Sequence, residues 1–588
     1  MTRRPIRIAN CSGFYGDKLT AAREMVDGGP IDVLTGDYLA ELTMLLLWKG
    51  RRKDPAAGYA RTFLTQLEHV LGDCLDRDIK IVTNAGGLNP AGLASRIQEL
   101  ADRLGLAPRV AHVTGDDLMD RIGDLQAAGV DLANLDTGQP LASTDRKTIT
   151  ANAYLGGWGI ASALAADADI VVCPRVTDAS LVVGPAAWWH GWARDDWDPL
   201  AGAVAAGHVI ECGPQACGGN YSNLEEITDR RYPGFPIAEV AADGSSVITK
   251  HPGTGGLVSP STVTAQLLYE IAAPEYLNPD VVAHFDTVSL AQQGPHRVLV
   301  SGCLGSPPPE TLKVAINQLG GYRNTMTLIL TGLDIEAKAA WALDLLFENL
   351  GGRERFEDVD VRLLRFDHPD ASTNAEAGAH LRITVKDPDP RKVGRAFSGA
   401  FMELSLASYA GFHTTTPPTP ESEYGVYWPT LVPASFVQHA VVLPDGSRTL
   451  VPHTCASASP PAAPRAAAHS PTRFGPTGPT ERVPLGRVCG ARSGDKGGNA
   501  NVGLWTRTDE QYAWLRGYLT PDRLRELLPE AAELVVLRFE LPRLRALNFV
   551  VVGLLGEGVA SSTRPDPQAK GLGEYLRSRL VDVPNTLL

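Results

Sequence analysis

The chain has 588 residues and a formal net charge of −13, with 44% hydrophobic and 21% charged residues. This length exceeds what one hydrophobic core usually organises, and the composition excludes a largely disordered protein. The negative net charge argues against nucleic-acid binding. The only Lys/Arg-rich run, residues 49–53, lies at the end of an apolar helical segment, where cations interact favourably with the helix dipole.

The eight cysteines are scattered without any CxxC pair. This spacing argues against a zinc ribbon or a disulfide framework and indicates a reducing environment. No apolar stretch is long enough to cross a bilayer, and residues 1–20 lack the apolar segment of a signal peptide. We therefore expect a cytoplasmic protein that makes no membrane contact.

The first 175 residues repeat one pattern, in which an apolar strand leads to a small polar loop and then to a helix. Strands are predicted at residues 6–9, 31–35, 79–83, 109–113 and 170–173. The last of these, around Val171, is a continuous apolar run that fits a strand buried on both faces. The pattern predicts an α/β fold with a mostly parallel sheet and helices on both faces.

Polar residues and glycines follow these strands. Right-handed crossovers place the loops at one edge of a parallel sheet, where ligands bind in such folds. We therefore expect one site to gather Asp37, Asn84, Gly86, Gly87, Asn89, Asp116, Arg175, Thr177 and Asp178. The alternative is a set of solvated loops in which Asp178 caps the next helix.

Two later segments are rich in glycine. Residues 207–221 include Asn220 and Cys217, and so many small residues imply tight backbone geometry near a ligand or another chain. Cys217 is either a nucleophile with His208 or His251 as its base, or a small buried hydrophobe.

The second segment, residues 250–260, precedes a helix predicted at residues 261–271. A glycine-rich loop beside a helix start holds a phosphate or carboxylate through backbone N–H groups, or else is a tight structural turn. Its candidate ligand-binding residues are Lys250, His251, Gly253, Thr254 and Gly255. Neither a Walker A loop, nor a nicotinamide or flavin fingerprint, nor metal-ligand spacing occurs, so we expect no cofactor and no metal.

The rest of the chain divides by composition. We assign residues 1–455 to a large domain, with a parallel-sheet core at 1–275 and an α+β extension at 276–455. Residues 456–482 form an Ala/Pro-rich linker, and residues 483–588 form a small ferredoxin-like α+β domain. The small domain contains a polar, glycine-rich loop at residues 492–501 that either reaches the first domain's site or contacts another subunit. The loop's candidate binding residues are Arg492, Asp495 and Lys496.

Several long motifs occur in one order along the chain. They are GDYLAELT from Gly36, TNAGGLNP from Thr83, NAYLGGWGIASAL from Asn152, RVTDASLVVGP from Arg175, GHVIECGPQACGGN from Gly207 and TKHPGTGGLVSPSTVTAQLLYE from Thr249. With these motifs the chain resembles the acyclic terpene utilisation (AtuA-type) family. ARSGDKGGNANVG from Ala491 resembles the small C-terminal domain that accompanies it. One departure is Pro174, where family members usually carry glycine, which implies a different substrate fit at that loop.

The resemblance implies a role in the breakdown of acyclic terpenoids, beside enzymes that act on acyl-CoA thioesters. We therefore expect an enzyme that acts on an acyl-CoA or a branched terpenoid-derived carboxylate. The expected chemistry is proton transfer next to the thioester carbonyl, as in a hydratase or lyase. Asp178 would be the general acid or base, Arg175 would hold a carboxylate, and His251 would complete the catalytic set.

Two other functions stay open at this stage. The first is a non-catalytic acyl-CoA or terpenoid-binding partner of an acyl-CoA carboxylase. The second is a phosphate-ester or polyphosphate hydrolase, which would need Mg²⁺ at the aspartate-rich strand ends. A homo-oligomer is expected because large metabolic proteins are commonly symmetric assemblies.

Overall fold

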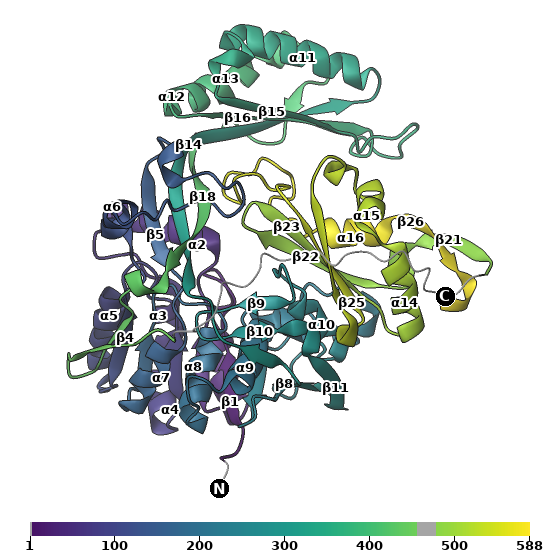
Figure 1. Cartoon of the computed structure of the whole chain (residues 1–588). Coiled ribbons are helices and arrows are strands. Elements are labelled where there is room, and N and C mark those ends of the chain that lie inside the picture. Colours follow the sequence, from purple (N-terminus) through teal and green to yellow (C-terminus); the bar gives the residue numbers. More distant parts are fainter. Residues whose placement is uncertain (1–2, 455–477) are drawn as a thin grey trace.

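A large mixed sheet forms the base of the protein in the computed structural model, which describes residues 3–454 and 478–588 (Figure 1). Its centre consists of parallel strands in the spatial order β1 (Ile6–Asn10), β2 (Val33–Gly36), β3 (Lys80–Thr83), β6 (Ile170–Val172) and β4 (Val110–Thr114). Ile170 and Val171 face opposite apolar clusters, which confirms that β6 is buried on both faces.

Antiparallel strands extend this centre on both sides, so the prediction of a mostly parallel sheet was wrong. The first side carries β7 (Pro236–Val240), β8 (Ser246–Lys250), β12 (Arg297–Ser301) and β11 (Ser289–Gly294), and the other carries β19 (Ala440–Val442) and β20 (Arg448–Leu450). These strands join the sheet as hairpins, which need no crossover helix, so the strand–helix repeat in the sequence does not register them.

Helices cover both faces of the parallel centre, as predicted. One apolar cluster packs the sheet against α1 (Ala21–Asp27), α3 (Arg61–Glu68), α4 (Leu71–Asp76) and α5 (Pro90–Leu104). The other packs it against α7 (Trp158–Ala165), α8 (Ser180–His190) and α9 (Trp197–Ile210). None of the helices in the described residues has both the length and the apolar character needed to span a bilayer.

A second sheet rises from the base and builds an upper lobe (Figure 1). Its axis is the 21-residue strand β14 (Thr311–Thr331), whose first half pairs with β5 (Thr148–Ala153). The other partners of β14, the edge strand and the lobe helices are β18 (Ser422–Pro433), β17 (His413–Thr414), β16 (Gly378–Asp387), β15 (Asp358–Leu364), α11 (Ile335–Leu350), α12 (Pro390–Val393) and α13 (Arg395–Glu403). One long strand therefore joins the base and the lobe.

Smaller elements fill the space around these sheets. They are β9 (Glu275–Leu277), β10 (Val282–His284), β13 (Leu304–Ser306), α2 (Glu41–Lys53), α6 (Ile122–Ala127) and α10 (Pro260–Leu267). Ser259 caps α10 and Pro260 is its first residue, so the helix predicted at residues 261–271 is present but ends at Leu267.

The C-terminal part is a four-stranded antiparallel sheet with three helices. Its strands lie in the order β22 (Gly490–Lys496), β23 (Asn499–Trp505), β25 (Ala546–Val551) and β24 (Val536–Leu541), with α14 (Asp509–Tyr518), α15 (Pro521–Leu527), α16 (Leu572–Ser578) and a separate pair, β21 (Thr480–Pro484) and β26 (Leu580–Pro584). Most of the predicted linker, residues 456–477, lies outside the described residues, as does residue 455 at the end of the predicted large domain.

The predicted loop at residues 492–501 is instead a β-hairpin. β22 and β23 pair along their whole length, and Gly497 and Gly498 form the turn, with φ of +63° at Gly497. Two glycines between extended segments are a hairpin signal, because a two-residue turn of this hand needs positive φ. The polar composition of the segment concealed this pattern.

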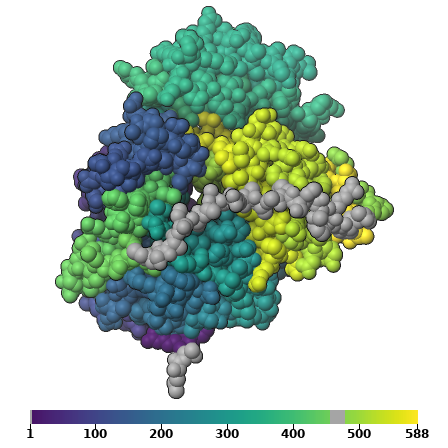
Figure 2. Space-filling view, in the orientation of Figure 1, coloured from purple at the N-terminus to yellow at the C-terminus, as the bar shows by residue number. Residues whose placement is uncertain are grey.

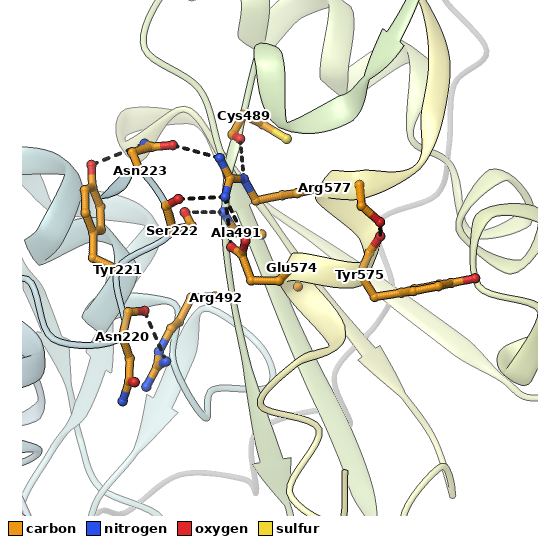
Figure 3. A network of polar contacts seen from close by, with 12 residues as sticks. Asn220, Tyr221, Ser222, Asn223, Cys489, Ala491, Arg492, Glu574, Tyr575 and Arg577 are labelled. Carbon is orange, nitrogen blue, oxygen red and sulfur yellow. Dashed lines mark hydrogen bonds and ion pairs between the residues drawn. The ribbon is translucent and has the colours of Figure 1, made fainter. Parts of the chain in front are cut away.

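The C-terminal part docks on the large part through polar contacts to backbone groups. Asn501 Oδ1 accepts a hydrogen bond from Glu270 N at 2.8 Å, and Asn548 Nδ2 donates to Ala272 O at 2.6 Å. Figure 3 shows Arg577 reaching from α16 to Ser222 O at 2.7 Å and to Asn223 Oδ1 at 3.1 Å. These contacts fix the position of the hairpin relative to the base.

We predict that Asn501→Ala weakens this docking. The substitution leaves the Glu270 N–H and the Asn548 side-chain oxygen without their buried partner, so we expect the free energy of unfolding to fall by about 1–3 kcal/mol. Denaturant unfolding measures this, with the exposed Asn349→Ala as a control that should change it by less than about 0.5 kcal/mol. Equal effects of the two variants would contradict the prediction.

Candidate functional site

The first part of the site lies where the central strands β2 and β3 end. Asp37 follows β2 and Asn84 follows β3, and Asn84 Nδ2 donates a hydrogen bond to Asp37 Oδ1 at 2.6 Å. Asn84 Oδ1 in turn accepts from Tyr38 N at 2.7 Å. Both side chains are buried. The parallel topology therefore brings these two loops together, as expected from the shared edge of the strands.

The loop after β6 adds an ion pair. Arg175 Nη2 lies 2.6 Å from Asp178 Oδ1, and Arg175 Nη1 donates to Leu39 O. Asp116 supports this loop from β4, because its Oδ2 accepts from Arg175 N at 3.3 Å and from Asn152 Nδ2 at 2.7 Å. Arg175 thus binds Asp116, Leu39 and Asp178, and these contacts fix the ion pair between Arg175 and Asp178 in place.

The β22–β23 hairpin closes the site from the C-terminal part. Asp495 and Lys496 lie at the end of β22, next to the turn, where Gly498 N donates to Asp136 Oδ2 at 3.0 Å. Lys496 Nζ lies 5.6 Å from the ring centre of Tyr276, and Glu270 is among the groups that act electrostatically on both Asp495 and Lys496. Of the two predictions for this segment, the structure supports the one in which it reaches the first domain's site.

Four carboxyl groups of this cluster have a raised pKa. Burial raises the pKa of Asp37, Glu211 and Glu270 above their ordinary values, and the neighbouring carboxyl of Asp178 raises those of Asp37 and Glu211 further. Burial, followed by the negative charge of Glu270, raises the pKa of Asp495 to about 8. A carboxylic acid in this range holds its proton at neutral pH and can donate it.

The cations of the cluster respond to the same burial. Burial and the nearby ammonium of Lys313 lower the pKa of Lys496. Burial also opposes the charge of Arg175, but the ring of Tyr154, 4.3 Å away, and the Asp178 carboxylate raise its pKa overall. The site therefore combines a fixed positive charge at Arg175 with a lysine that loses its proton more easily than usual.

Unused hydrogen-bonding capacity marks this cluster as a binding place. Among the buried side-chain atoms that make no hydrogen bond within the described residues, three belong to this cluster: Arg175 Nε, Glu211 Oε2 and Asp495 Oδ1. The Asp178 and Lys313 side chains keep 30% and 32% of their exposure. Buried polar groups in folded proteins are nearly always paired, so unpaired atoms beside partly accessible charges are typical of a ligand site.

The glycine-rich loop at residues 250–256 lies in a different environment. Lys250 Nζ donates to Thr254 O at 2.7 Å, Thr254 Oγ1 donates to His251 O at 2.8 Å, and Gly253 O accepts from Arg231. His251 Nε2 lies 2.9 Å from Met25 O at the end of α1. The structure therefore does not bring His251, Lys250, Gly253, Thr254 or Gly255 to Asp178, and their polar atoms stabilise a turn.

Other predicted residues serve the backbone of the site. Gly86 N donates to Cys173 O at 3.1 Å, Gly87 N donates to Asn84 O at 3.2 Å, and Asn89 caps α5 through Gly92 N. Thr177 Oγ1 lies 2.5 Å from Ser180 Oγ. These polar groups are occupied within the protein, so they shape the loops around Asp37 and Asp178.

Arg492 and Asn220 lie at the rim between the two parts of the chain (Figure 3). The Arg492 guanidinium lies 4.1 Å from the ring centre of Tyr269 and donates to the Gln215 side chain and to Asn220 O, the latter at 3.4 Å. Asn220 itself is exposed, with φ of +54°. Both residues therefore contribute to docking.

The structure argues against Cys217 as a nucleophile. Its side chain is buried, and burial raises the pKa of the Cys217 thiol to about 12. At neutral pH the reactive thiolate is then scarce. His208 lies 3.3 Å from Glu211 but is buried between Tyr276 and Phe285, which lowers its pKa to about 4.

Several charged residues that complete the cluster were not predicted from the sequence. Glu211 lies in the glycine-rich segment 207–221, where the cysteines drew attention instead. Glu270 follows α10 with φ of +57°, an unusual conformation that no local sequence signal announces. Glu41 and Lys313, which lie 3.5 Å apart, come from α2 and β14 and meet only in the tertiary structure.

Among residues 3–454 and 478–588, no group of three or more His, Cys, Asp or Glu side chains is arranged to hold a metal ion. The chemistry that the cluster itself offers is proton transfer between carboxyl groups, with cationic groups beside them.

Fold and site together define a class: an α/β protein whose charged site lies at the strand ends of a large domain and is completed by a small C-terminal domain. The sequence profile of the acyclic terpene utilisation family protein AtuA matches residues 6–443, and that of the AtuA ferredoxin-like domain matches residues 483–582. The chain belongs to the acyclic terpene utilisation (AtuA) family, as its motifs predicted. Neither the curated proteins nor the solved structures provide a match.

We predict that Asp116 makes stability depend on pH. Burial raises the pKa of Asp116 to about 7, so at pH 5 the folded protein holds a proton that the unfolded chain has released. Stability from this group is therefore lost as pH rises from 5 through 7, by an amount on the order of a few kcal/mol. Asp116→Asn should flatten this dependence.

Denaturant unfolding at pH 5 and pH 8 checks this, with Asp102→Asn, an exposed change on α5, as the control. The control should keep the wild-type difference between the two pH values. An unchanged difference in Asp116→Asn would show that this carboxyl does not govern the pH response.

Proposed function

We propose that this protein is an enzyme that acts on an acyl-CoA thioester or a branched terpenoid-derived carboxylate by moving a proton next to the carbonyl group. Addition or loss of water, or a lyase cleavage, is the reaction type that fits. The observation that carries the proposal is the cluster itself, which combines acids of raised pKa with Lys496 and Arg175 between two domains. The family's association with acyclic terpene utilisation supports the substrate class.

The proposal divides the proton transfer between two carboxyl groups. Asp178 accepts the proton from the carbon next to the carbonyl, and Arg175 orients it, because both Nη atoms of Arg175 are engaged by Asp178 and Leu39. This role differs from the expected grip of Arg175 on a substrate carboxylate. Asp495, whose pKa is about 8, supplies a proton at neutral pH. Pairs of carboxyls in contrasting environments are a common division of acid and base.

Charge that develops on the carbonyl oxygen needs a cation or a hydrogen-bond donor. Lys496 meets this need in the proposal, because its ammonium lies in a buried site and reaches the cluster from the hairpin. Electrostatic stabilisation of an enolate-like oxygen is strongest where water is excluded. The rings of Tyr154, Tyr276 and Tyr427 act electrostatically on these charges and offer apolar surface to a branched acyl chain.

We predict that Asp178→Asn abolishes turnover and keeps ligand binding. Loss of a general base typically lowers the rate about 10²–10⁴-fold, while the amide preserves the shape of the side chain. The assay incubates pure protein with a panel of branched unsaturated acyl-CoAs and follows mass changes of one water or one acetate unit. Asp102→Asn serves as the matched control.

Two results would decide against the base assignment. Full activity of Asp178→Asn would remove Asp178 from the chemistry. Binding of acyl-CoA by the wild-type protein without any product across the panel would favour the non-catalytic carrier that hands ligand to an acyl-CoA carboxylase.

A second prediction concerns the pH profile. If Asp495 donates the proton, kcat/KM falls as pH rises through about 8, since the acid then loses its proton. Asp495→Asn should lower kcat/KM below pH 8 and remove this alkaline limb. A wild-type alkaline limb that persists unchanged in Asp495→Asn would assign the limb to another group.

The cellular setting belongs to the same proposal. We propose a cytoplasmic protein that forms a homo-oligomer and works beside an acyl-CoA carboxylase, on a small-molecule substrate and without nucleic acid, membrane, cofactor or metal. A phosphate-ester or polyphosphate hydrolase remains the alternative reaction. Turnover of a phosphate ester that disappears with a strong chelator would favour it over acyl-CoA chemistry.

A further inference from the structure

A second polar region lies far from this cluster, on the upper lobe. In β14, β15 and β16 the apolar side chains alternate with polar ones, and the apolar set packs against α11, α12 and α13. The opposite face is polar, with Arg323 beside Lys386, Thr325 beside Thr384 and Thr327 beside Arg382 in the strand register. Figure 1 shows the helices above this sheet and the C-terminal part below it.

The C-terminal part covers this polar face with one loop. Arg323 Nη1 donates to Ser562 O at 3.1 Å, and Arg382 donates to Thr563 O. A cavity of about 240 Å³ lies between the sheet and the loop. Figure 2 shows the upper lobe resting on the C-terminal part along this seam. The lining residues are Arg323, Thr325, Arg382, Thr384, Val559, Ser562, Thr563, Arg564, Pro565 and Pro567.

Three arginines converge on the cavity with too few carboxylates to balance them. Among the described residues, neither Arg323 nor Arg382 has a carboxylate within 4 Å. Asp360 acts on Arg382 from beyond this distance and opposes the lowering of its pKa by burial, but the Asp360 carboxylate is bound by Arg362 at 2.9 Å. Arg564 pairs with Glu530, but its buried Nε makes no hydrogen bond within the described part of the chain.

Such an arrangement is costly unless an anion compensates it. Burial lowers the pKa of both Arg323 and Arg382, and the charge of Arg382 lowers that of Arg323 further. Both arginines are half-buried and donate only to carbonyl oxygens, and charges withdrawn from water without an opposite charge beside them cost stability. Guanidinium groups bind phosphate oxygens in pairs of parallel hydrogen bonds, and neighbouring threonine hydroxyls supply further donors.

We propose that the cavity lined by Arg323, Arg382 and Arg564 binds the phosphate group of a small phosphorylated molecule. A phosphate dianion balances the two arginines that lack a carboxylate, and Thr325 and Thr384 lie in the same wall. The volume holds more than an inorganic anion, so part of an attached group fits as well.

This phosphate site is separate from the charged cluster around Asp178. Lys313 of the cluster and Arg323 of the cavity lie ten residues apart on β14, which corresponds to roughly 33 Å along an extended strand. The phosphate therefore belongs either to the far end of a long substrate such as a CoA thioester or to a separate phosphorylated ligand. The site does not depend on the proposed reaction.

The test measures binding of inorganic phosphate and of CoA to the full chain at constant ionic strength, by calorimetry and by thermal unfolding. Phosphate should raise the melting temperature in a saturable way, because it binds the folded state. Arg382→Gln and Arg323→Gln should weaken phosphate binding about tenfold or more. Arg362→Gln, on the neighbouring strand but paired with Asp360, should leave it unchanged.

The CoA arm separates the two sources of phosphate. Weaker CoA binding in Arg382→Gln together with weaker phosphate binding assigns the site to the substrate's phosphate. Unchanged CoA binding with weaker phosphate binding assigns it to a separate ligand. Absence of phosphate binding by the wild-type chain, or equal binding in wild type and Arg382→Gln, overturns the proposal.

A crystal soak keeps the proposal testable if the variants fail to fold. Tungstate, an electron-dense analogue of phosphate, should lie within hydrogen-bonding distance of Arg323 and Arg382 in the wild-type protein. Tungstate bound only at other places would overturn the assignment.

Discussion

Burial of charge between two domains is the constraint on which the site depends. The large part supplies Asp37 and Asp178 at its strand ends and Glu211 at the end of α9, and the hairpin of the C-terminal part supplies Asp495 and Lys496. Burial disfavours ionised groups, so the same docking raises the pKa of the acids and lowers that of the lysine. Glu270 of the large part acts electrostatically on Asp495 and Lys496 of the hairpin, so the docking of the hairpin sets part of the charge balance of the site.

Docking of the hairpin therefore has to be rigid, and the contacts that secure it are directed largely to backbone atoms. Asn501, Asn548 and Arg577 bind the backbone of the large part at Glu270, Ala272 and Ser222. Backbone partners do not change rotamer, so such contacts define position more firmly than two long side chains would. Hydrogen bonds outside the charged cluster therefore fix its geometry.

The sequence predicted the part of this arrangement that local patterns encode. The apolar run around Val171 predicted a strand buried on both faces. The rule that parallel strands end at one edge of a sheet predicted that Asp37 and Asn84 lie together. Glu211, Glu270 and Lys313 were out of reach, because each lies on an element whose position is set by tertiary packing. The antiparallel flanks of the main sheet were not predicted either, because hairpins leave no strand–helix repeat in the sequence.

Several residues that were predicted to bind a ligand have structural roles instead. Gly86 lies where an added Cβ would approach Cys173 O to 2.5 Å, so glycine is needed there for close backbone packing. The Lys250 side chain stabilises a turn, and the Asn89 side chain caps a helix. Glycine-rich and polar segments serve both purposes, and residue type alone does not separate them.

Unused bonding capacity indicates a ligand-binding group where it coincides with other charged side chains. Alone it is no such indication, because Ser246 Oγ and Trp505 Nε1 also lack a partner in the described part of the chain. By this criterion Glu211 and Asp495 belong to a site, and so does Arg564, whose buried Nε has no partner in the described part of the chain. The first two lie among carboxyls of raised pKa, and the third lies beside Arg323 and Arg382, which lack carboxylates, so the two regions differ in chemistry as well as in place. One chain therefore presents a region suited to proton transfer and, along the same long strand, a region suited to an anion.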